Sequence, residues 1–434
     1  IAIQNFMLAL VSATDAIMLG WIDQTSLSAV SLAGQVQFVL SLFISGIAAG
    51  AGIMAAQYWG KQDAASIEKV IPIALRTNLL FSGLFTILAG FCPEMLMRIF
   101  TNDAALVASG SQYLRAVALS YVLCGISQVY LILLKNTGHA AVSSRISSTA
   151  VVLNIILNAI LIYGLCGAPA LGIRGAAYAT VAARVVELIW AYLETKKPER
   201  VRILWNRLFS SAGKILSEDF WRYTLPVLAA SLVWGIAYVL YSVIMGHMGS
   251  DAVAANSITS IAKSLLSCLI RGVSGGAGVL IGNLLGANEL EKAREYGGRL
   301  SHLSIAIGIV TGGLLVLISP AIVHFAPLSD TAAEYMQYML LFCGLNLMAQ
   351  SVNTTVLDGI FCAGGDAKFD MQGNIGAMWC FSVPLGFLAA FWLKLPVMVV
   401  YCIVNLDEIV KLPAVYHHYK KYIWVRNITR DVED

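Results

Sequence analysis

Four polar side chains in the first half of the chain have the chemistry to hold a proton or a small cation. Asp15 lies in the segment ALVSATDAIMLG, which has no basic residue within four positions of the acid. Asn154 and Asn158 are four residues apart, so a helix places them on one face, and Thr180 follows in the next apolar segment. A carboxylate, two amide oxygens and a hydroxyl can keep a proton on the acid or bind a hard monovalent cation. The set predicts an ion-coupling site.

Most other ionisable residues in the apolar segments have a partner of opposite charge at helical spacing. Spacings of three and four residues place two side chains on one helix face. The sequence predicts structural ion pairs of this kind among Arg184, Glu187, Asp407, Glu408 and Lys411. The last three contain one carboxylate more than Lys411 can neutralise. Asp358 and Arg271 are expected at similar depths in neighbouring segments, and we interpret them as a further structural pair.

The composition assigns these residues to a membrane protein. Hydrophobic residues make up 58% of the 434 positions, charged residues only 12%, and the mean hydropathy is +0.76, whereas soluble domains carry about 25% charge. A helix needs about 20 apolar residues to cross a hydrocarbon core of about 30 Å. Twelve such spans are predicted: 1–20, 25–58, 68–97, 105–136, 141–165, 172–194, 221–247, 250–285, 297–323, 331–363, 369–392 and 395–418. The predicted fold class is all-α.

The two halves of the chain repeat one another. Five glycines recur at a constant offset of 226 residues: Gly20, Gly46, Gly50, Gly52 and Gly60 reappear as Gly246, Gly272, Gly276, Gly278 and Gly286. Glycine spacing constrains backbone geometry, so both halves are expected to build the same backbone. Because each half holds an even number of spans, the repeats are parallel and form two six-helix bundles. The predicted organisation is a first lobe at 1–194, a linker at 195–220, a second lobe at 221–418 and a tail at 419–434.

The distribution of lysine and arginine predicts the orientation. With an inner N-terminus, only Arg98, Arg174 and Lys394 fall on the outer side, so both chain ends are expected in the cytoplasm. This bias accounts for the small net charge of +3 and leaves no reason to expect a nucleic acid partner. The chain begins at Ile1 without a methionine, and we expect that an N-terminal segment precedes it.

The repeat also provides an internal control for the ion-coupling site. Counterparts in the second half are Tyr241 for Asp15, Cys380 or Phe381 for Asn154, Pro384 or Leu385 for Asn158, and Leu406 or Asp407 for Thr180. The shared fold therefore does not require the polar set, which favours a function specific to the first half. The alternative is a polar seam that only joins helices.

Aromatic residues provide candidates for substrate contact. Tyr121, Trp234, Tyr238 and Tyr241 have ring faces that could receive a planar cation, and thirteen methionines add adaptable apolar surface. The alternative, packing or anchoring at the membrane interface, is the commoner role for aromatic residues at these spacings.

Several segments resemble the multidrug and toxic compound extrusion (MATE) transporters of the DinF-like bacterial type. They are TDAIMLG, AAQYWGKQD, LNIILNAILIYG, GIRGAAYAT, LLKNTGHA, IFCAGGDA and the ending DEIVKLPAVYHHYKKYIWVRN. The resemblance covers essentially the whole chain. It implies a V-shaped pair of six-helix lobes that exports amphipathic, often cationic compounds in exchange for H⁺ or Na⁺.

The resemblance also assigns the family's coupling positions to Asp15, Asn154, Asn158 and Thr180. Many members have an aspartate where this chain has Asn158, and many have an acid in the seventh span where this chain has Ser231. The family pattern therefore leaves Asp15 as the main coupling acid.

Other functions are less well supported by the sequence. No HExxH or P-loop motif occurs, so an enzyme or an ATP-driven pump is not expected, and no cofactor or metal is implied beyond Na⁺. A flippase for lipid-linked precursors is the alternative, but such proteins usually have fourteen spans and a cationic cavity, and few bases here look unpaired. A channel is compatible with the composition, but duplicated lobes suit alternating access better. The expected protein is a monomer in a bacterial cytoplasmic membrane, with small amphipathic substrates.

Overall fold

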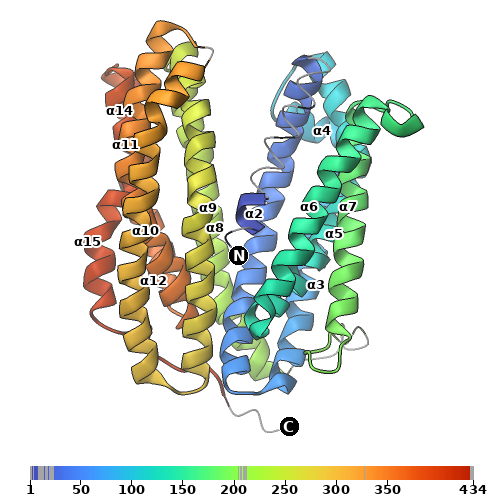
Figure 1. Cartoon of the computed structure of the whole chain (residues 1–434), viewed down its shortest axis with the longest axis vertical. Coiled ribbons are helices and arrows are strands. Elements are labelled where there is room, and N and C mark those ends of the chain that lie inside the picture. Colours follow the sequence, from blue (N-terminus) through green and yellow to red (C-terminus); the bar gives the residue numbers. More distant parts are fainter. Residues whose placement is uncertain are drawn as a thin grey trace. The chain divides into compact units, whose positions relative to one another are not determined.

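The computed structural model describes residues 2, 4–7, 14, 18, 24–203, 205, 208, 213–326 and 328–430. Almost all of these residues are helical, and none of them lies in a β-strand. Long helices run side by side within each half of the chain (Figure 1). The all-α prediction is therefore confirmed.

Two compact units divide the chain between Leu228 and Ala229. The helices of the first unit are α2 (Gln24–Gly60), α3 (Ala64–Phe91), α4 (Pro93–Arg98), α5 (Ala104–Leu134), η1 (Lys135–His139), α6 (Ala140–Tyr163), η2 (Leu165–Gly167) and α7 (Ile173–Thr195). Helix α8 (Lys214–Gly246) contains the division, so its first turns belong to the first unit. The predicted linker at 195–220 stays a prediction.

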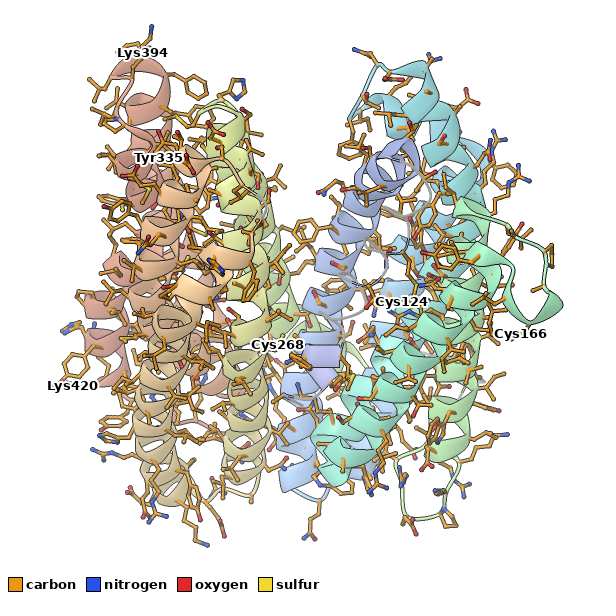
Figure 2. All side chains as sticks on the ribbon, turned by 45° about the horizontal axis from the view of Figure 1, so that its top comes forward. Cys124, Cys166, Cys268, Tyr335, Lys394 and Lys420 are labelled. Carbon is orange, nitrogen blue, oxygen red and sulfur yellow. The ribbon has the colours of Figure 1, made fainter. Side chains whose placement is uncertain are left out.

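The second unit continues from α8 through shorter and more irregular elements. Its helices are α9 (Ser250–Gly286), α10 (Leu290–Phe325), α11 (Asp330–Thr354), η4 (Thr355–Phe361), α12 (Ala367–Asn374), η5 (Ile375–Ser382), α13 (Val383–Phe387), η6 (Leu388–Trp392), α14 (Val397–Val404) and α15 (Asp407–Tyr419). The segments η4, η5 and η6 are π-helical. Figure 2 shows Lys394 at one end of this unit and Lys420 nearer the other end.

The helix boundaries reproduce the predicted spans closely. Eleven of the twelve predicted spans fall on described helices, and the span at 1–20 lies largely outside the described residues. Among the described residues, nine helical stretches are long and apolar enough to cross a membrane, and one of them, Ala104–Tyr163, contains two predicted spans. Hydropathy and length sufficed here because the bilayer imposes both.

The last predicted span is not the continuous helix that its hydropathy suggested. It is divided into α14 and α15 at Asn405 and Leu406. The Asn405 side chain donates to the carbonyl of Tyr401 at 3.0 Å, and the backbone carbonyl of Asn405 accepts from Asn346 Nδ2 at 2.6 Å. Side-chain hydrogen bonds of this kind compete with the helical pattern. The break also gives α15 its own N-terminus, where two acids stand in the first turn.

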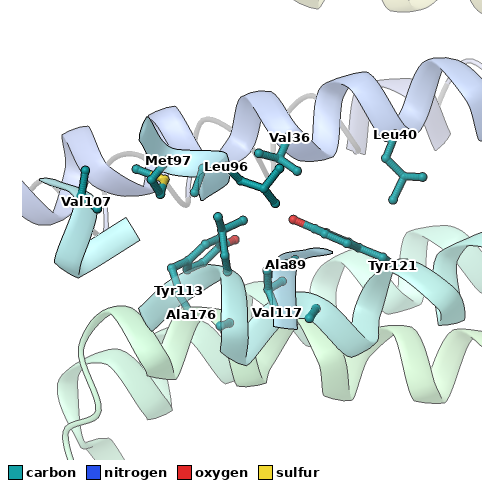
Figure 3. Close-up of a cluster of buried hydrophobic side chains, with 14 of the residues drawn as sticks. Val36, Leu40, Ala89, Leu96, Met97, Val107, Tyr113, Val117, Tyr121 and Ala176 are labelled. Carbon is teal, nitrogen blue, oxygen red and sulfur yellow. The ribbon is translucent and has the colours of Figure 1, made fainter. Parts of the chain in front are cut away.

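Helix α5 lies at the centre of the first unit, where it packs against α2, α3 and α7. Figure 3 shows Val36 and Leu40 of α2, Ala89 of α3, and Val117 and Tyr121 of α5 among the buried apolar side chains. This core holds the helices in fixed register and so sets the positions of the polar residues beside it.

Candidate functional site

The three described members of the predicted ion-coupling set meet between α6 and α7. Asn158 Nδ2 donates to Asn154 Oδ1 at 3.2 Å, and Asn154 Nδ2 donates to Thr180 Oγ1 at 3.3 Å. Thr180 Oγ1 donates in turn to the carbonyl of Ala176 at 3.0 Å. Both asparagines are buried. The structure thus forms one hydrogen-bonded polar line from residues that are up to 26 positions apart.

A close approach of two backbones creates this line. Gly175 of α7 faces α6, and a methyl group at this position would lie 2.6 Å from the carbonyl carbon of Leu161. The turn between the helices begins at Gly164, whose φ of 74° favours glycine. Because no side chain separates the helices here, Thr180 comes within hydrogen-bond distance of Asn154.

Two oxygens in the polar line can still accept a further contact. Asn154 Oδ1 and Thr180 Oγ1 each accept one of these hydrogen bonds, and each oxygen has a second lone pair. An oxygen pair of this kind can bind a hard cation or accept a proton-bearing carboxyl group.

Asp15, the acid predicted to complete the site, lies outside the described residues. Its neighbour in sequence, Met18, is described and packs against the core of the first unit. Tyr163 at the end of α6 donates its hydroxyl to the Met18 carbonyl at 2.7 Å. The helix that carries the two asparagines is therefore attached to the chain three residues beyond Asp15.

The aromatic candidates fall into two different environments. Tyr121 is buried in the first unit's core, and its hydroxyl has no hydrogen-bond partner among the described residues. Trp234, Tyr238 and Tyr241, in contrast, line a cavity of about 140 Å³ in the second unit. The rings of Trp234 and Tyr238 stack with centroids 5.5 Å apart. These three residues, but not Tyr121, present their side chains to one cavity.

A buried charged cluster adjoins this cavity. Lys411 Nζ lies 3.3 Å from Glu408 Oε1 and 3.6 Å from Asp407 Oδ2, and both acids also line the cavity. Asn353 Nδ2 donates to Glu408 Oε2 at 2.8 Å. Lys411 also donates to Asn374 Oδ1 at 3.1 Å, which links the cluster to α12.

The other predicted ion pair lies within α7. Arg184 Nη1 contacts Glu187 Oε2, and the glutamate side chain is only 1% exposed. The structural role assigned to this pair and to the Lys411 cluster stays a prediction.

Several polar contacts of the second unit were not predicted by the sequence analysis. Asp370 accepts a hydrogen bond from Asn374 at 3.2 Å, and Lys263 donates to Asn346 Oδ1 at 2.9 Å. The four-residue spacing of Asp370 and Asn374 was a usable signal, because polar residues at that spacing in an apolar span share a face. No comparable signal existed for Lys263 and Asn346, which are 83 positions apart.

The interpretation of Arg271 and Asp358 as a contact pair is not supported. Arg271 lines the cavity from α9, but it forms no ion pair within 4.0 Å with any residue that the structure describes. Lys263 also has no carboxylate partner at that distance. The expectation that few intramembrane bases are unpaired stays a prediction, and these two bases have no carboxylate contact within 4.0 Å among the described residues.

Sequence comparison finds similarity along both halves of the chain. The family model MatE matches residues 1–160 and 226–388. An uncharacterized transporter of Bacillus subtilis, YisQ, is 21% identical over 412 residues, which cover 95% of this chain and 90% of YisQ. The probable multidrug resistance protein NorM of Agrobacterium fabrum is 24% identical over 387 residues, which cover 87% of this chain and 82% of that protein.

Solved structures share the fold. A crystal structure of MATE in the straight conformation matches with a TM-score of 0.87 and 20% identity, and the match covers 97% of this chain and 93% of that one. A MOP superfamily transporter from Pyrococcus furiosus, described as having a binding pocket of reverse polarity, matches with a TM-score of 0.87 and 19% identity. That match covers 97% of this chain and 94% of that chain.

Proposed function

The chain belongs to the MatE family of multidrug efflux transporters, and on this premise we propose that it is an antiporter that exports amphipathic cations in exchange for H⁺ or Na⁺. Its fold is the all-α fold of this family, with twelve transmembrane helices in two six-helix bundles. Members of the family are transporters and not enzymes. The coupling ion, the substrate class and the cytoplasmic location of both termini are part of the proposal.

The polar line between α6 and α7 is the observation that carries the proposal. Asn158, Asn154 and Thr180 place amide and hydroxyl oxygens in a bundle whose neighbouring core is apolar. Polar groups within a membrane are costly and usually serve a function. The second half of the sequence has no equivalent set, so the fold itself does not account for the line.

The mechanism follows from the charge of Asp15. We propose that this carboxylate lies beside the polar line, because Tyr163 of α6, the helix that carries both asparagines, donates to the carbonyl of Met18, three residues beyond Asp15. When Asp15 is ionised, the oxygens of Asn154 and Thr180 would complete a site for Na⁺ or hold the charged form in place. Binding of the ion from outside removes the net charge and favours a different packing of the first span against α6 and α7. The change in packing releases the substrate.

Transport by purified protein in proteoliposomes tests this function. An imposed pH or Na⁺ gradient should drive uptake or release of a fluorescent cationic substrate, and Asp15→Asn should abolish the gradient dependence. Cys380→Ala is a matched control, because Cys380 is a repeat counterpart of Asn154 and lies outside the polar line. Transport that keeps its gradient dependence in Asp15→Asn would remove Asp15 from the coupling role.

A flippase for lipid-linked precursors is the second candidate. Lys263 and Arg271 at the cavity favour it, because neither has a described carboxylate within 4.0 Å and such flippases bind anionic headgroups. The same vesicles with a labelled anionic lipid distinguish the two functions. Lipid movement without any transport of the cation would support the flippase and contradict the antiporter.

A further inference from the structure

Two basic residues of α9 line the cavity of the second unit without an acidic contact. Lys263 and Arg271 stand eight positions apart, and neither has a carboxylate within 4.0 Å among the described residues. Lys263 uses one of its three N–H donors on Asn346 Oδ1. Arg271 has no hydrogen bond to the described part of the chain, and the charge of Asp358 acts on it only from a greater distance. N–H donors of Lys263 and Arg271 are therefore available to a ligand in the cavity.

The two acids that line the cavity, Asp407 and Glu408, already contact other side chains of the protein. Glu408 accepts from Lys411 through one carboxylate oxygen and from Asn353 through the other. Asp407 lies 3.6 Å from the same lysine, whose side chain is only 5% exposed. The two acids thus contact a buried cation, whereas Lys263 acts on them only from beyond 4.0 Å and no described carboxylate lies within that distance of either base of α9. Lys263 and Arg271 therefore lack a negatively charged acceptor in direct contact.

The remaining wall suits a flat apolar group. Trp234 and Tyr238 form a stacked pair, and Tyr241, Tyr401, Met245 and Met378 line the same space. Aromatic faces and flexible thioethers accept planar rings of varied outline. The cavity therefore combines a surface for an aromatic ring with unpaired cationic donors.

We propose that this cavity binds aromatic compounds through a carboxylate that Arg271 and Lys263 receive while the ring lies against Trp234 and Tyr238. Arginine matches a carboxylate in bidentate geometry, and such charge-assisted bonds are strongest where water is scarce. The inference rests on the proposed transport function and changes its substrate class. The exported compounds include aromatic acids and zwitterions, not only cations.

A matched set of ligands tests the proposal directly. Indole-3-propionate carries an acid, tryptophan carries an acid and an amine, and tryptamine carries only an amine. Calorimetry with the detergent-purified protein should show that both carboxylate ligands bind at least about tenfold more tightly than tryptamine. Equal or tighter binding of tryptamine would overturn the proposal.

Variants identify the residues that receive the carboxylate. Arg271→Gln and Lys263→Gln should each weaken indole-3-propionate binding by about tenfold and leave tryptamine binding unchanged, which also shows that the variants fold. Arg299→Gln is the control, because Arg299 is an exposed base of α10 that pairs with Glu295 outside the cavity. Loss of acid binding in the control as well, or in neither cavity variant, would contradict the assignment.

Two further measurements separate this inference from competing ones. Asp15→Asn should abolish gradient-driven transport but keep indole-3-propionate binding, so a failure of coupling and a failure of this site give different results. Binding of short-chain phosphatidic acid tests whether the site receives a lipid headgroup instead. If it binds in an Arg271-dependent manner while none of the indole ligands does, the site receives a lipid headgroup and the proposal is wrong.

Discussion

The two halves of the chain build the same long helices and then use them differently. Helices α2 and α9 each have 37 residues, and their bounds differ by the 226-residue offset at both ends. The starts of α5 and α11 differ by the same offset. Yet the first unit carries an uncharged polar line between α6 and α7, whereas the second carries a charged cluster beside a cavity. The duplicated halves keep the bounds of these long helices, whereas their polar side chains differ.

The shared glycines show the same divergence in packing. A methyl group at Gly50 would lie 2.6 Å from Cβ of Thr224 at the start of α8, whereas at Gly276 no described atom lies within 4 Å. One glycine of the pair is required for close packing, and its counterpart is not. Equal spacing therefore indicates a common backbone but does not establish common contacts.

The largest expected effect concerns the charged cluster, which has no equivalent in the first unit. Lys411→Met leaves Asp407 and Glu408 without their shared cation, and we expect a loss of about 3–5 kcal/mol in stability, the usual cost of breaking a buried ion pair. Thermal unfolding in detergent measures it. The double variant with Glu408→Gln should recover part of the loss, and a wild-type melting temperature for Lys411→Met would show that the cluster does not support the fold.

A matched pair of glycine variants tests the divergence in packing. Gly50→Ala should destabilise the protein by about 1–3 kcal/mol, because the added methyl group overlaps Thr224. Gly276→Ala should change stability by less than about 0.5 kcal/mol, since the position is open. Equal effects in the same unfolding assay would mean that the two glycines pack alike after all.

The polar line should matter for transport more than for stability. Asn154→Leu removes the central group of the line, and we expect gradient-driven transport to fall by about tenfold, or about 1.4 kcal/mol in coupling. Cys380→Leu, at the repeat counterpart, should transport normally. A normal rate in Asn154→Leu together with a large drop in melting temperature would instead favour the interpretation as a packing seam.

A smaller loss than those of Lys411→Met and Gly50→Ala is expected at the contact between the first span and α6. Tyr163→Phe removes one hydrogen bond to the Met18 carbonyl, and we expect a loss of about 1 kcal/mol. The repeat counterpart at the 226-residue offset is Ala389, which has no hydroxyl, so the contact is specific to the first half. Unfolding in detergent again provides the measurement, and no change would indicate that the contact contributes nothing to stability.

Sequence alone was most successful where local rules apply. Span positions follow from hydropathy and length, and the meeting of Asn154 with Asn158 follows from a four-residue spacing. The break at Asn405 was not predicted, because it depends on a hydrogen bond from Asn346 on another helix. The same holds for the cavity, whose lining comes from distant segments that hydropathy does not relate to one another. Asp15 remains a prediction outside the described residues.

The contact between Gly175 and Leu161 has a consequence for movement during transport. Where two helix backbones touch without an intervening side chain, no layer of flexible side chains lets the helices slide past each other. We therefore expect α6 and α7 to move as one rigid unit. The separation of Asn154 and Thr180 then stays constant through the transport cycle. In the proposed cycle, any change at this site therefore depends on the segments that pack against these two helices.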